Sequence, residues 1–289
     1  MKPAPFDYER PSSISEACRI LDEAGGGATL IAGGQTLMPL LNLRMSQPFV
    51  LVDLGGIAEL HAVSRTDGAT RIGPMLTQNA ARADGMIARH VPILAHALAH
   101  VGHHQTRNRG TVGGSIALGE PAAECPATAV ALGATIQLQS AHGARSVAAE
   151  EFYVGPYMTT AEPDEIVTSI DFPDWPDGTT MLFREVAQRP GDFALVGLVG
   201  ALAVSDGVIA RAGIAWFGMG PTPVKARQAE QALAGTAITA IDPLAIADLA
   251  IADTAPFDDQ HASAEYRRTV GRKIFQRTLS EALQLEVAA

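Results

Sequence analysis

Two pairs of adjacent glycines place the tightest local constraint on how this 289-residue chain can fold. The first pair follows a short apolar stretch in ATLIAGGQT (28–36), and the second lies in NRGTVGGSIALGE (108–120). Glycine adopts positive φ without strain, so each pair permits a sharp turn whose N–H groups point into a concave nest. We therefore expect a short buried strand to end at the first pair, and the chain to turn sharply at both.

A nest of backbone N–H groups attracts anions, and the dipole at a helix N-terminus strengthens that preference. The candidate donors are the amides around Gly33, Gly34, Gln35, Thr36, Gly113 and Gly114, the hydroxyls of Thr36 and Thr111, and Ser115. Two nests suit a diphosphate better than a single phosphate, and a downstream carboxylate could accept from a ribose hydroxyl. A lone glycine pair is more often plain turn chemistry, so the residues alone leave a turn and a nucleotide site both open.

Other chemical motifs are absent from the sequence. It has no G-x-G-x-x-G in a βαβ context and no G-x-x-x-x-G-K-[ST], so a Rossmann or P-loop domain is a poor match. It also lacks a G-x-S-x-G elbow, and the adjacent His103 and His104 have no partner ligands at metal spacing. We therefore predict no catalytic acid, base or nucleophile and no metal site in this chain.

The overall composition excludes several classes of protein. A formal net charge of −10 argues against a nucleic-acid surface, which needs clustered lysine and arginine. Cys18 and Cys125 are the only cysteines, too few for an iron–sulfur cluster or a cysteine-rich zinc site. The N-terminus has no apolar signal-peptide core, and the longest apolar run (193–204) is too short to span a bilayer. We expect a cytoplasmic protein that is not inserted in a membrane.

Helical and strand patterns alternate in the first part of the chain. Residues 11–25 combine a serine-rich start, helical apolar spacing and a glycine stop, which predicts a capped amphipathic helix. The further expected elements are strands at 49–56 and 69–77, two helical pieces over 76–102 split near Pro92, a strand–turn–strand at 134–155 and a strand at 165–173. This alternation with short loops indicates an α/β or α+β arrangement.

A segment rich in proline, glycine and aspartate, PDWPDGTT (173–180), is the expected domain boundary. Beyond it, residues 193–220 have the pattern of two strands joined by a Ser-Asp-Gly hairpin. Helices are predicted at 222–235 and 261–286, and we expect them to cover one face of the antiparallel sheet. The C-terminal part is therefore predicted to be a compact α+β domain.

The order of several motifs resembles the FAD-binding subunit of molybdenum hydroxylases. The motifs are LIAGGQTLMPLLNLRM (30–45), LVDL (51–54), RIGPMLT (71–77), GHHQTRNRGTVGGSIALGEPAAE (102–124), FREVAQRPGDFALVG (183–197) and SAEYRR (263–268). That family includes the medium subunits of carbon monoxide dehydrogenase and of N-heteroaromatic hydroxylases, and the middle domain of xanthine dehydrogenase. The similarity covers nearly the whole chain.

The resemblance implies a fold and a domain division. The expected fold is α+β: a vanillyl-alcohol-oxidase-type FAD-binding fold of two α/β subdomains, followed by a small C-terminal α+β domain. We place the FAD-binding domain at residues 1–174, with subdomains at about 1–56 and 57–174, and the C-terminal domain at 178–289.

The resemblance also assigns residues to the FAD pyrophosphate. These are Ala32, Gly33, Gly34, Gln35, Thr36 and Leu37 in the first loop, and Thr111, Gly114 and Ser115 in the second, with Ala117 nearby. Two residues depart from the family pattern: Gln35 is often histidine in relatives, and Glu120 is often aspartate.

The remaining assignments concern the ribose, the adenine and the flavin. Glu124 matches the family's acidic residue near the ribose, and Val101 falls where the family packs a side chain on the adenine. Nearer the flavin, the expected residues are Ile166 or Val167 on an approaching strand, Arg184 close to the ring system, and Phe193 over the isoalloxazine, where stacking is physically sensible.

For function, the resemblance implies an electron relay within a larger enzyme. The expected partners are a small iron–sulfur subunit and a large molybdopterin subunit, which carry the iron–sulfur clusters and the molybdopterin cofactor in a dimer of heterotrimers. This chain would take electrons from the clusters and pass them to an external acceptor. Two alternatives stay open: a self-contained FAD oxidoreductase, and a non-catalytic nucleotide-binding assembly module. The sequence names neither the substrate of the assembly nor the acceptor.

Overall fold

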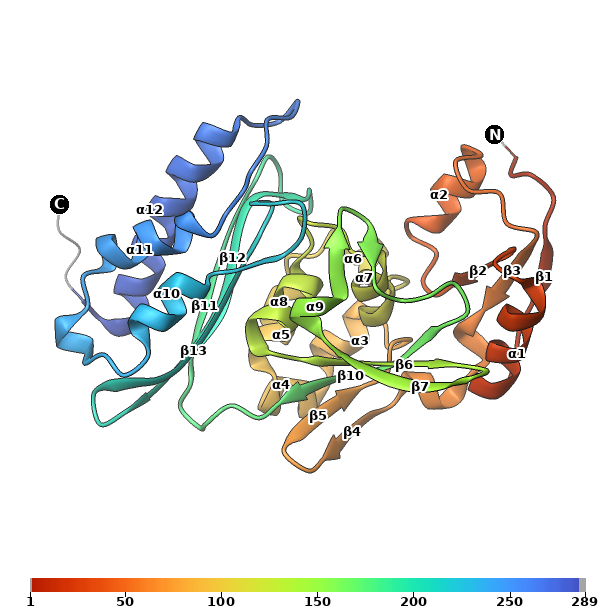
Figure 1. Ribbon diagram of the computed structural model, residues 1–289, viewed down its shortest axis with the longest axis horizontal. Coiled ribbons are helices and arrows are strands. Elements are labelled where there is room, and N and C mark those ends of the chain that lie inside the picture. The colour runs from red at the N-terminus through yellow and green to blue at the C-terminus, as the bar shows by residue number, and fades with distance from the viewer. Residues whose placement is uncertain (1, 286–289) are drawn as a thin grey trace.

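The computed structural model describes residues 2–285 and contains three larger β-sheets that follow one another along the long axis of the molecule (Figure 1). One layer of helices lies between the central and the C-terminal sheets, and a second layer covers the outer side of the C-terminal sheet (Figure 1). No helix within residues 2–285 has the length and apolar character needed to cross a bilayer.

The N-terminal sheet is parallel, with the strand order β1–β3–β2. Its strands are β1 (Asp7–Glu9), β2 (Ala28–Ile31) and β3 (Val50–Asp53). The short helix α2 (Leu37–Asn42) lies between β2 and β3, and the 3-10 helices η1 (Leu54–Gly56) and η2 (Ala58–His61) follow β3. The four residues of β2 are half-buried, whereas a buried strand was expected. Strand β2 ends at Ile31, one residue before the first glycine pair, close to where the sequence predicted. The loop that follows it therefore starts at the carboxyl edge of the sheet.

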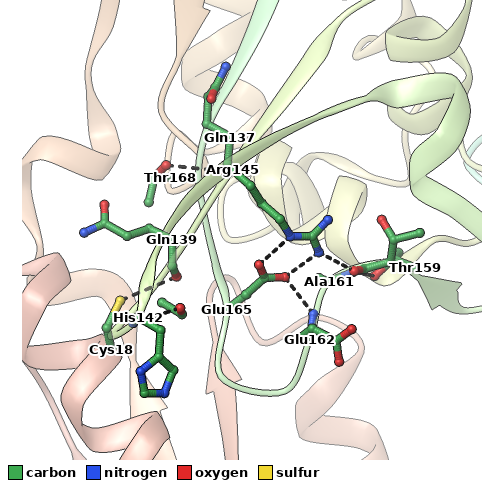
Figure 2. Close-up of polar contacts among 12 residues, drawn as sticks. Cys18, Gln137, Gln139, His142, Arg145, Thr159, Ala161, Glu162, Glu165 and Thr168 are labelled. Carbon is green, nitrogen blue, oxygen red and sulfur yellow. Dashed lines mark hydrogen bonds and ion pairs between the residues drawn. The ribbon is translucent and has the colours of Figure 1, made fainter.

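Helix α1 (Ile14–Ala24) is the capped helix that the sequence predicted at 11–25. The Ser13 hydroxyl accepts a hydrogen bond from the Glu16 amide, and Gly25 ends the helix with a φ of 54°. On its buried side, the Cys18 thiol donates to the Gln139 carbonyl at 3.5 Å (Figure 2). This contact joins the N-terminal sheet layer to the central sheet.

The central sheet has the strand order β4–β5–β10–β6–β7, and all of its pairings are antiparallel. Its strands are β4 (Val63–Thr66), β5 (Ala69–Ile72), β6 (Thr135–Ser140), β7 (Gly143–Ala148) and β10 (Ile166–Pro173). Strand β10 comes last in the sequence but lies in the middle of the sheet. The central sheet is therefore complete only when residues up to 173 have folded onto it.

Arg145 on β7 fixes the loop that leads into β10 (Figure 2). Its guanidinium donates to both carboxylate oxygens of Glu165, at 2.6 and 2.7 Å, and to the Thr160 carbonyl at 2.6 Å. The Glu165 carboxylate also accepts from the Glu162 amide at 2.8 Å. These bonds to the charged form lower the pKa of Glu165, so the brace is ionic at neutral pH.

Helices fill the space above the central sheet. They are α3 (Gln78–Ala83), α4 (Gly85–His90), α5 (Pro92–Ala97), α6 (His104–Arg107), α7 (Val112–Leu118), α8 (Glu124–Leu132) and α9 (Ala149–Phe152), with a small hairpin of β8 (Tyr153–Gly155) and β9 (Met158–Thr159). The sequence predicted two helical pieces over 76–102, but the structure has three there. The additional break is at Asp84, whose carboxylate accepts from the amides of Met86 and Ile87 and so caps α4.

The C-terminal sheet is antiparallel, with the order β11–β12–β13–β14. Its strands and helices are β11 (Thr180–Ala187), β12 (Ala194–Ser205), β13 (Val208–Phe217), β14 (Val224–Lys225), α10 (Arg227–Leu233), η3 (Ile238–Ala240), α11 (Pro243–Ala252) and α12 (Ala264–Leu283). The strand–turn–strand at 193–220 and the late helix agree with the sequence. The helix predicted at 222–235 begins only at Arg227 in the structure, because residues 224–225 pair with β13. Helix α11 was not predicted.

The core between the C-terminal sheet and its outer helices predicts a large loss of stability on truncation of Trp216. This side chain is fully buried and its indole N–H donates to the Ala250 carbonyl at 3.0 Å. Trp216→Ala should lower the free energy of unfolding by about 3–5 kcal/mol in urea titrations. Tyr266→Ala, at a position exposed on α12, should change it by less than about 0.5 kcal/mol. Equal effects of the two substitutions would contradict this description of the core.

Candidate functional site

The first glycine loop presents a row of unpaired amides. Within residues 2–285, the backbone N–H groups of residues 33–37 donate no hydrogen bond, although the Gly34 carbonyl accepts from Met38 where α2 begins. Gly34 has a φ of 70°, which a side chain would strain. Five consecutive free amides at the carboxyl edge of a sheet and the start of a helix form a site suited to an anion.

The two glycine loops meet at this nest. A β-carbon on Gly33 would lie 2.1 Å from the Arg109 carbonyl oxygen and 2.7 Å from the α-carbon of Gly110. A β-carbon on Gly114 would lie 3.5 Å from that of Ala32. A pocket of about 470 Å³ opens here, lined by Tyr8, Ile31, Ala32, Gly33, Gly34, Gln35, Met38, Pro39, Asp53 and Arg109. The structure therefore brings together the two segments that the sequence paired.

The second loop differs from the first, because its amides already have acceptors. The amides of Val112 and Gly113 donate to the carbonyls of Leu76 and Pro74, at 3.0 and 2.9 Å. Those of Gly114 and Ser115 donate to the hydroxyl and carbonyl oxygens of Thr111, at 2.9 and 3.2 Å. The start of α7 is thus closed by the protein, and the hydroxyls of Thr111 and Ser115 are the groups that can still donate.

Glu124 is the first residue of α8, a helix that packs against α7. Its side chain is only 5% exposed, and burial raises its pKa to about 8. The nearby charge of Glu185 acts in the same direction, whereas the guanidinium of Arg107 favours the ionised form. At pH 7 this carboxyl group is mostly protonated and can donate a hydrogen bond as well as accept one.

Val101 and Phe193 lie on two loops that touch each other. Val101 is half-buried, and the Arg107 guanidinium donates to its carbonyl oxygen at 2.8 Å. Phe193 is 60% exposed in the loop between β11 and β12. A β-carbon on Gly191 of that loop would lie 2.8 Å from the His103 ring. The loop that carries Phe193 is therefore seated on the segment that follows Val101.

The two strand residues expected near the flavin are buried in hydrophobic cores. Ile166 is fully buried among Cys18 and Leu21 of α1, and Val167 belongs to the larger core above the central sheet. Adjacent residues on a strand point to opposite faces, which explains the split. Ala117 on α7 is exposed, and Leu37 is half-buried at the start of α2.

Arg184 points away from both glycine loops. Its guanidinium pairs with Glu281 and approaches the Thr278 hydroxyl on α12, on the outer side of the C-terminal sheet. Strand alternation turns the next residue, Glu185, towards α5, where its carboxylate lies 3.7 Å from the His100 imidazole. The sequence analysis did not single out Glu185. The apolar Leu182 lies two residues before Arg184 on β11 and therefore on the same face, which indicates that Glu185 lies on the opposite face.

The two cysteines of the chain are buried thiols. Cys18 and Cys125 are buried and unpaired, and burial raises the pKa of the Cys125 thiol to about 12. In the part of the chain that the structure describes, no group of three histidine, cysteine or acidic side chains could hold a metal ion. The chemistry available here is therefore anion binding by amides and hydrogen bonding by buried carboxyl groups.

Two protein-family models match the chain. Residues 4–175 match the FAD binding domain in molybdopterin dehydrogenase, and residues 181–282 match the CO dehydrogenase flavoprotein C-terminal domain. Both matches agree with the family to which the ordered sequence motifs pointed.

Similarity to individual proteins extends over the whole chain. The alpha subunit of the 6-hydroxypseudooxynicotine dehydrogenase complex of Paenarthrobacter nicotinovorans is 36% identical, over 98% of this chain and 96% of the relative. The carbon monoxide dehydrogenase medium chain of Hydrogenophaga pseudoflava is 33% identical over 98% of both chains. A solved structure of carbon monoxide dehydrogenase from that organism matches with a TM-score of 0.94, at 34% identity, over 98% of this chain and 99% of the other. The fold implied by the resemblance is confirmed.

Burial of Glu124 predicts that stability falls as the pH rises. The carboxyl group titrates near 4.5 when unfolded and near 8 when folded, so between these values only the folded state retains the proton. The free energy of unfolding should therefore decrease across this window, by at most about 1.4 kcal/mol per pH unit for one such group. Glu185 and Glu230, with pKa values raised to about 7 by burial, act in the same direction.

Urea unfolding of the chain at several pH values between about 5 and 8 measures this slope. Glu124→Gln should make the slope shallower, because the amide has no proton to lose. Glu59→Gln, at an exposed position, serves as the control and should leave the slope unchanged. A Glu124→Gln slope as steep as that of the parent chain would show that this carboxyl group is not protonated in the folded state.

Proposed function

This chain belongs to the family of FAD-binding medium subunits of molybdenum hydroxylases, and we propose that it is the electron relay of such an enzyme. In this proposal, electrons arrive from iron–sulfur clusters on a small partner subunit and leave to an external acceptor. The substrate is oxidised on a large molybdopterin subunit. The chain's two cysteines, both buried, are too few to ligate a cluster, which supports placing the clusters on a partner.

The observation that carries the proposal is the open amide nest at residues 33–37, set against the second glycine loop. The nest suits the pyrophosphate of FAD, because three of the residues with free amides, Gly33, Gly34 and Gln35, line a pocket that also has Arg109 on its wall. Bound FAD supplies the electron chemistry, and the protein supplies position and electrostatics. The buried Oε1 atom of Gln78 lies beside Gly110 in the second loop and has no hydrogen-bond partner in the part of the chain that the structure describes.

We assign the remaining roles from the same geometry. We assign the hydroxyls of Thr111 and Ser115 to the second phosphate, and the protonated Glu124 to a ribose hydroxyl. Val101 and Phe193, on touching loops, supply apolar and aromatic surface for the adenine and the flavin. Arg184 joins this site only if its ion pair with Glu281 opens.

The relatives named above include a subunit of a dehydrogenase complex and a medium chain of carbon monoxide dehydrogenase. We infer that this chain works in the same kind of assembly, a dimer of heterotrimers with the small iron–sulfur and large molybdopterin subunits. We further infer a cytoplasmic location, which the two free thiols support. The domain division proposed above, 1–174 and 178–289, separates the FAD-binding part from the part that carries Phe193 and Glu185.

The contact between the two glycine loops predicts that Gly33→Ala abolishes FAD retention. The new methyl group would collide with the Arg109 carbonyl and separate the loops. Losing even one charge-assisted hydrogen bond, worth about 1.5–3 kcal/mol, weakens binding by roughly 10- to 150-fold. The flavin content per chain and the dissociation constant for added FAD measure the effect.

Gly85→Ala is the matched control for this substitution. It adds the same methyl group at a glycine that has open space around it and no positive φ, at the start of α4. It should retain FAD as the parent chain does. Full FAD retention by Gly33→Ala would contradict the loop assignment.

The relay proposal predicts how the flavin is reduced. The purified chain with FAD should stay oxidised when mixed with carbon monoxide, purines, N-heteroaromatics or aldehydes, because substrate oxidation takes place on a partner. Purification of a tagged chain from its native host should recover equimolar iron–sulfur and molybdenum-containing subunits. With those subunits present, the substrate of the assembly should bleach the flavin absorbance.

Two outcomes would contradict the relay. Reduction of the isolated chain by its own substrate would support a self-contained FAD oxidoreductase. A colourless chain that releases no FAD on denaturation would support a non-catalytic nucleotide-binding module.

A further inference from the structure

Glu185 is a buried carboxylate that points from the C-terminal sheet towards the FAD-binding half of the chain. Its side chain is 8% exposed, and its Oε2 atom has no hydrogen-bond partner within residues 2–285. A buried polar atom without a partner costs about 1–3 kcal/mol, so a position of this kind calls for a functional explanation. The nearest titratable group is His100, whose Nδ1 atom lies 3.7 Å from Oε2.

His100 connects this buried carboxylate to solvent. It stands just beyond the end of α5, and 43% of its side chain is exposed. Its ring packs against Phe183, at 4.6 Å between centroids, and against His96, at 5.4 Å. Packing on two sides limits the orientations of the imidazole, so one edge stays near Glu185 while the side chain still reaches water.

On its other side, Glu185 lies near Glu124, the residue that we assign to the FAD ribose. The negative charge of Glu185 raises the pKa of Glu124, and the positive charge of the Arg107 guanidinium lowers it. Arg107 donates from Nη1 to the carbonyls of Val101 and Gly102, while its buried Nε has no partner among the described residues. Arg109, two residues further on, is the residue whose carbonyl touches Gly33 in the nest.

We propose that Glu185 and His100 form a proton-exchange pair that carries protons between solvent and the FAD site. The proposal rests on the electron-relay function, because reduction by two electrons also takes up protons. The electrons come from the iron–sulfur partner and each proton comes from water. The imidazole takes a proton on its exposed side and releases one from Nδ1 to Glu185 Oε2. The carboxyl group then passes a proton towards the cofactor, so both groups recover their original charge.

The electrostatics of the two side chains agree with this role. Burial raises the pKa of Glu185 to about 7, so this carboxyl group both takes up and releases protons near neutrality. Burial and the neighbouring His96 lower the pKa of His100, which favours release of a proton from the imidazole. The titratable or charged groups facing the pair are His96 on α5 and Glu124 on α8, with Arg107 on α6 beyond Glu124. On the neighbouring strand β12, the residue paired with Glu185 is Gly197, which has no side chain.

The test follows proton uptake rather than enzyme turnover. Flash photoreduction of the full chain with bound FAD, in weak buffer with a pH-indicator dye, records flavin bleaching and proton uptake separately. In the parent chain the two should keep pace. Glu185→Gln should delay proton uptake by about a hundredfold, the low end for one positioned acid–base group, while FAD binding persists. Glu185→Asp should recover part of the rate, because it restores a carboxyl group.

A matched control separates this role from burial alone. Glu230→Gln removes another buried carboxyl group with a pKa of about 7 in the same domain, and it should leave proton uptake unchanged. If Glu185→Gln fails to fold, His100→Gln carries the test: its delay should be relieved by added imidazole. His142→Gln, at an exposed histidine paired with Asp22, controls for histidine removal.

The outcomes distinguish this proposal from the function on which it rests. A chain without FAD contradicts the relay function itself. Bound FAD with undelayed proton uptake in both Glu185→Gln and His100→Gln overturns the proton-exchange pair and leaves the relay intact. Infrared difference spectra of photoreduction give an independent readout, because a carboxyl band present in the parent chain should vanish in Glu185→Gln.

Discussion

Helix α8 is surrounded by protein on all sides, and the packing around it sets how the two halves of the chain fit together. All nine of its residues are buried, and it packs against β10 on one side and against β12 and β13 on the other. Strand β13 comes this close because Gly213 has no side chain: a β-carbon there would lie 2.3 Å from the Ala131 carbonyl. A helix with no solvent-facing side has no exposed position, so the acid at its start, Glu124, is buried with the rest.

The two glycine loops use the same residue type for different purposes. Gly33 permits two backbones to touch, and the amides after it stay free. Gly113 permits the start of α7 to reach Pro74, where a β-carbon would lie 2.1 Å away, and its amide is used in that contact. Glycine pairs therefore leave donors available only where no neighbouring carbonyl accepts from them, which is the case at the first loop.

Local signals in the sequence were sufficient for the capped helix at Ser13–Gly25, for the hairpin after Ala194 and for the turn at Gly34. The features that the sequence did not reveal depend on contacts between distant segments. The side on which Arg184 lies follows from α12 covering one face of β11, and the closed amides of α7 follow from acceptors at Pro74 and Leu76. Motif order identified the family, but a motif does not record which way a strand residue points.

The two buried acids, Glu124 and Glu185, lower the stability of the fold, and both lie where the two halves of the chain meet. Glu124 comes from the helix that the two halves share, and Glu185 from the sheet that packs against it. A sequence selected for stability alone would place apolar or fully paired groups at such positions. Their burial brings the pKa values of both carboxyl groups close to physiological pH, which is the range in which a group can both take up and release a proton. The burial that weakens the fold at high pH therefore also gives these two carboxyl groups the pKa range that proton exchange near neutral pH requires.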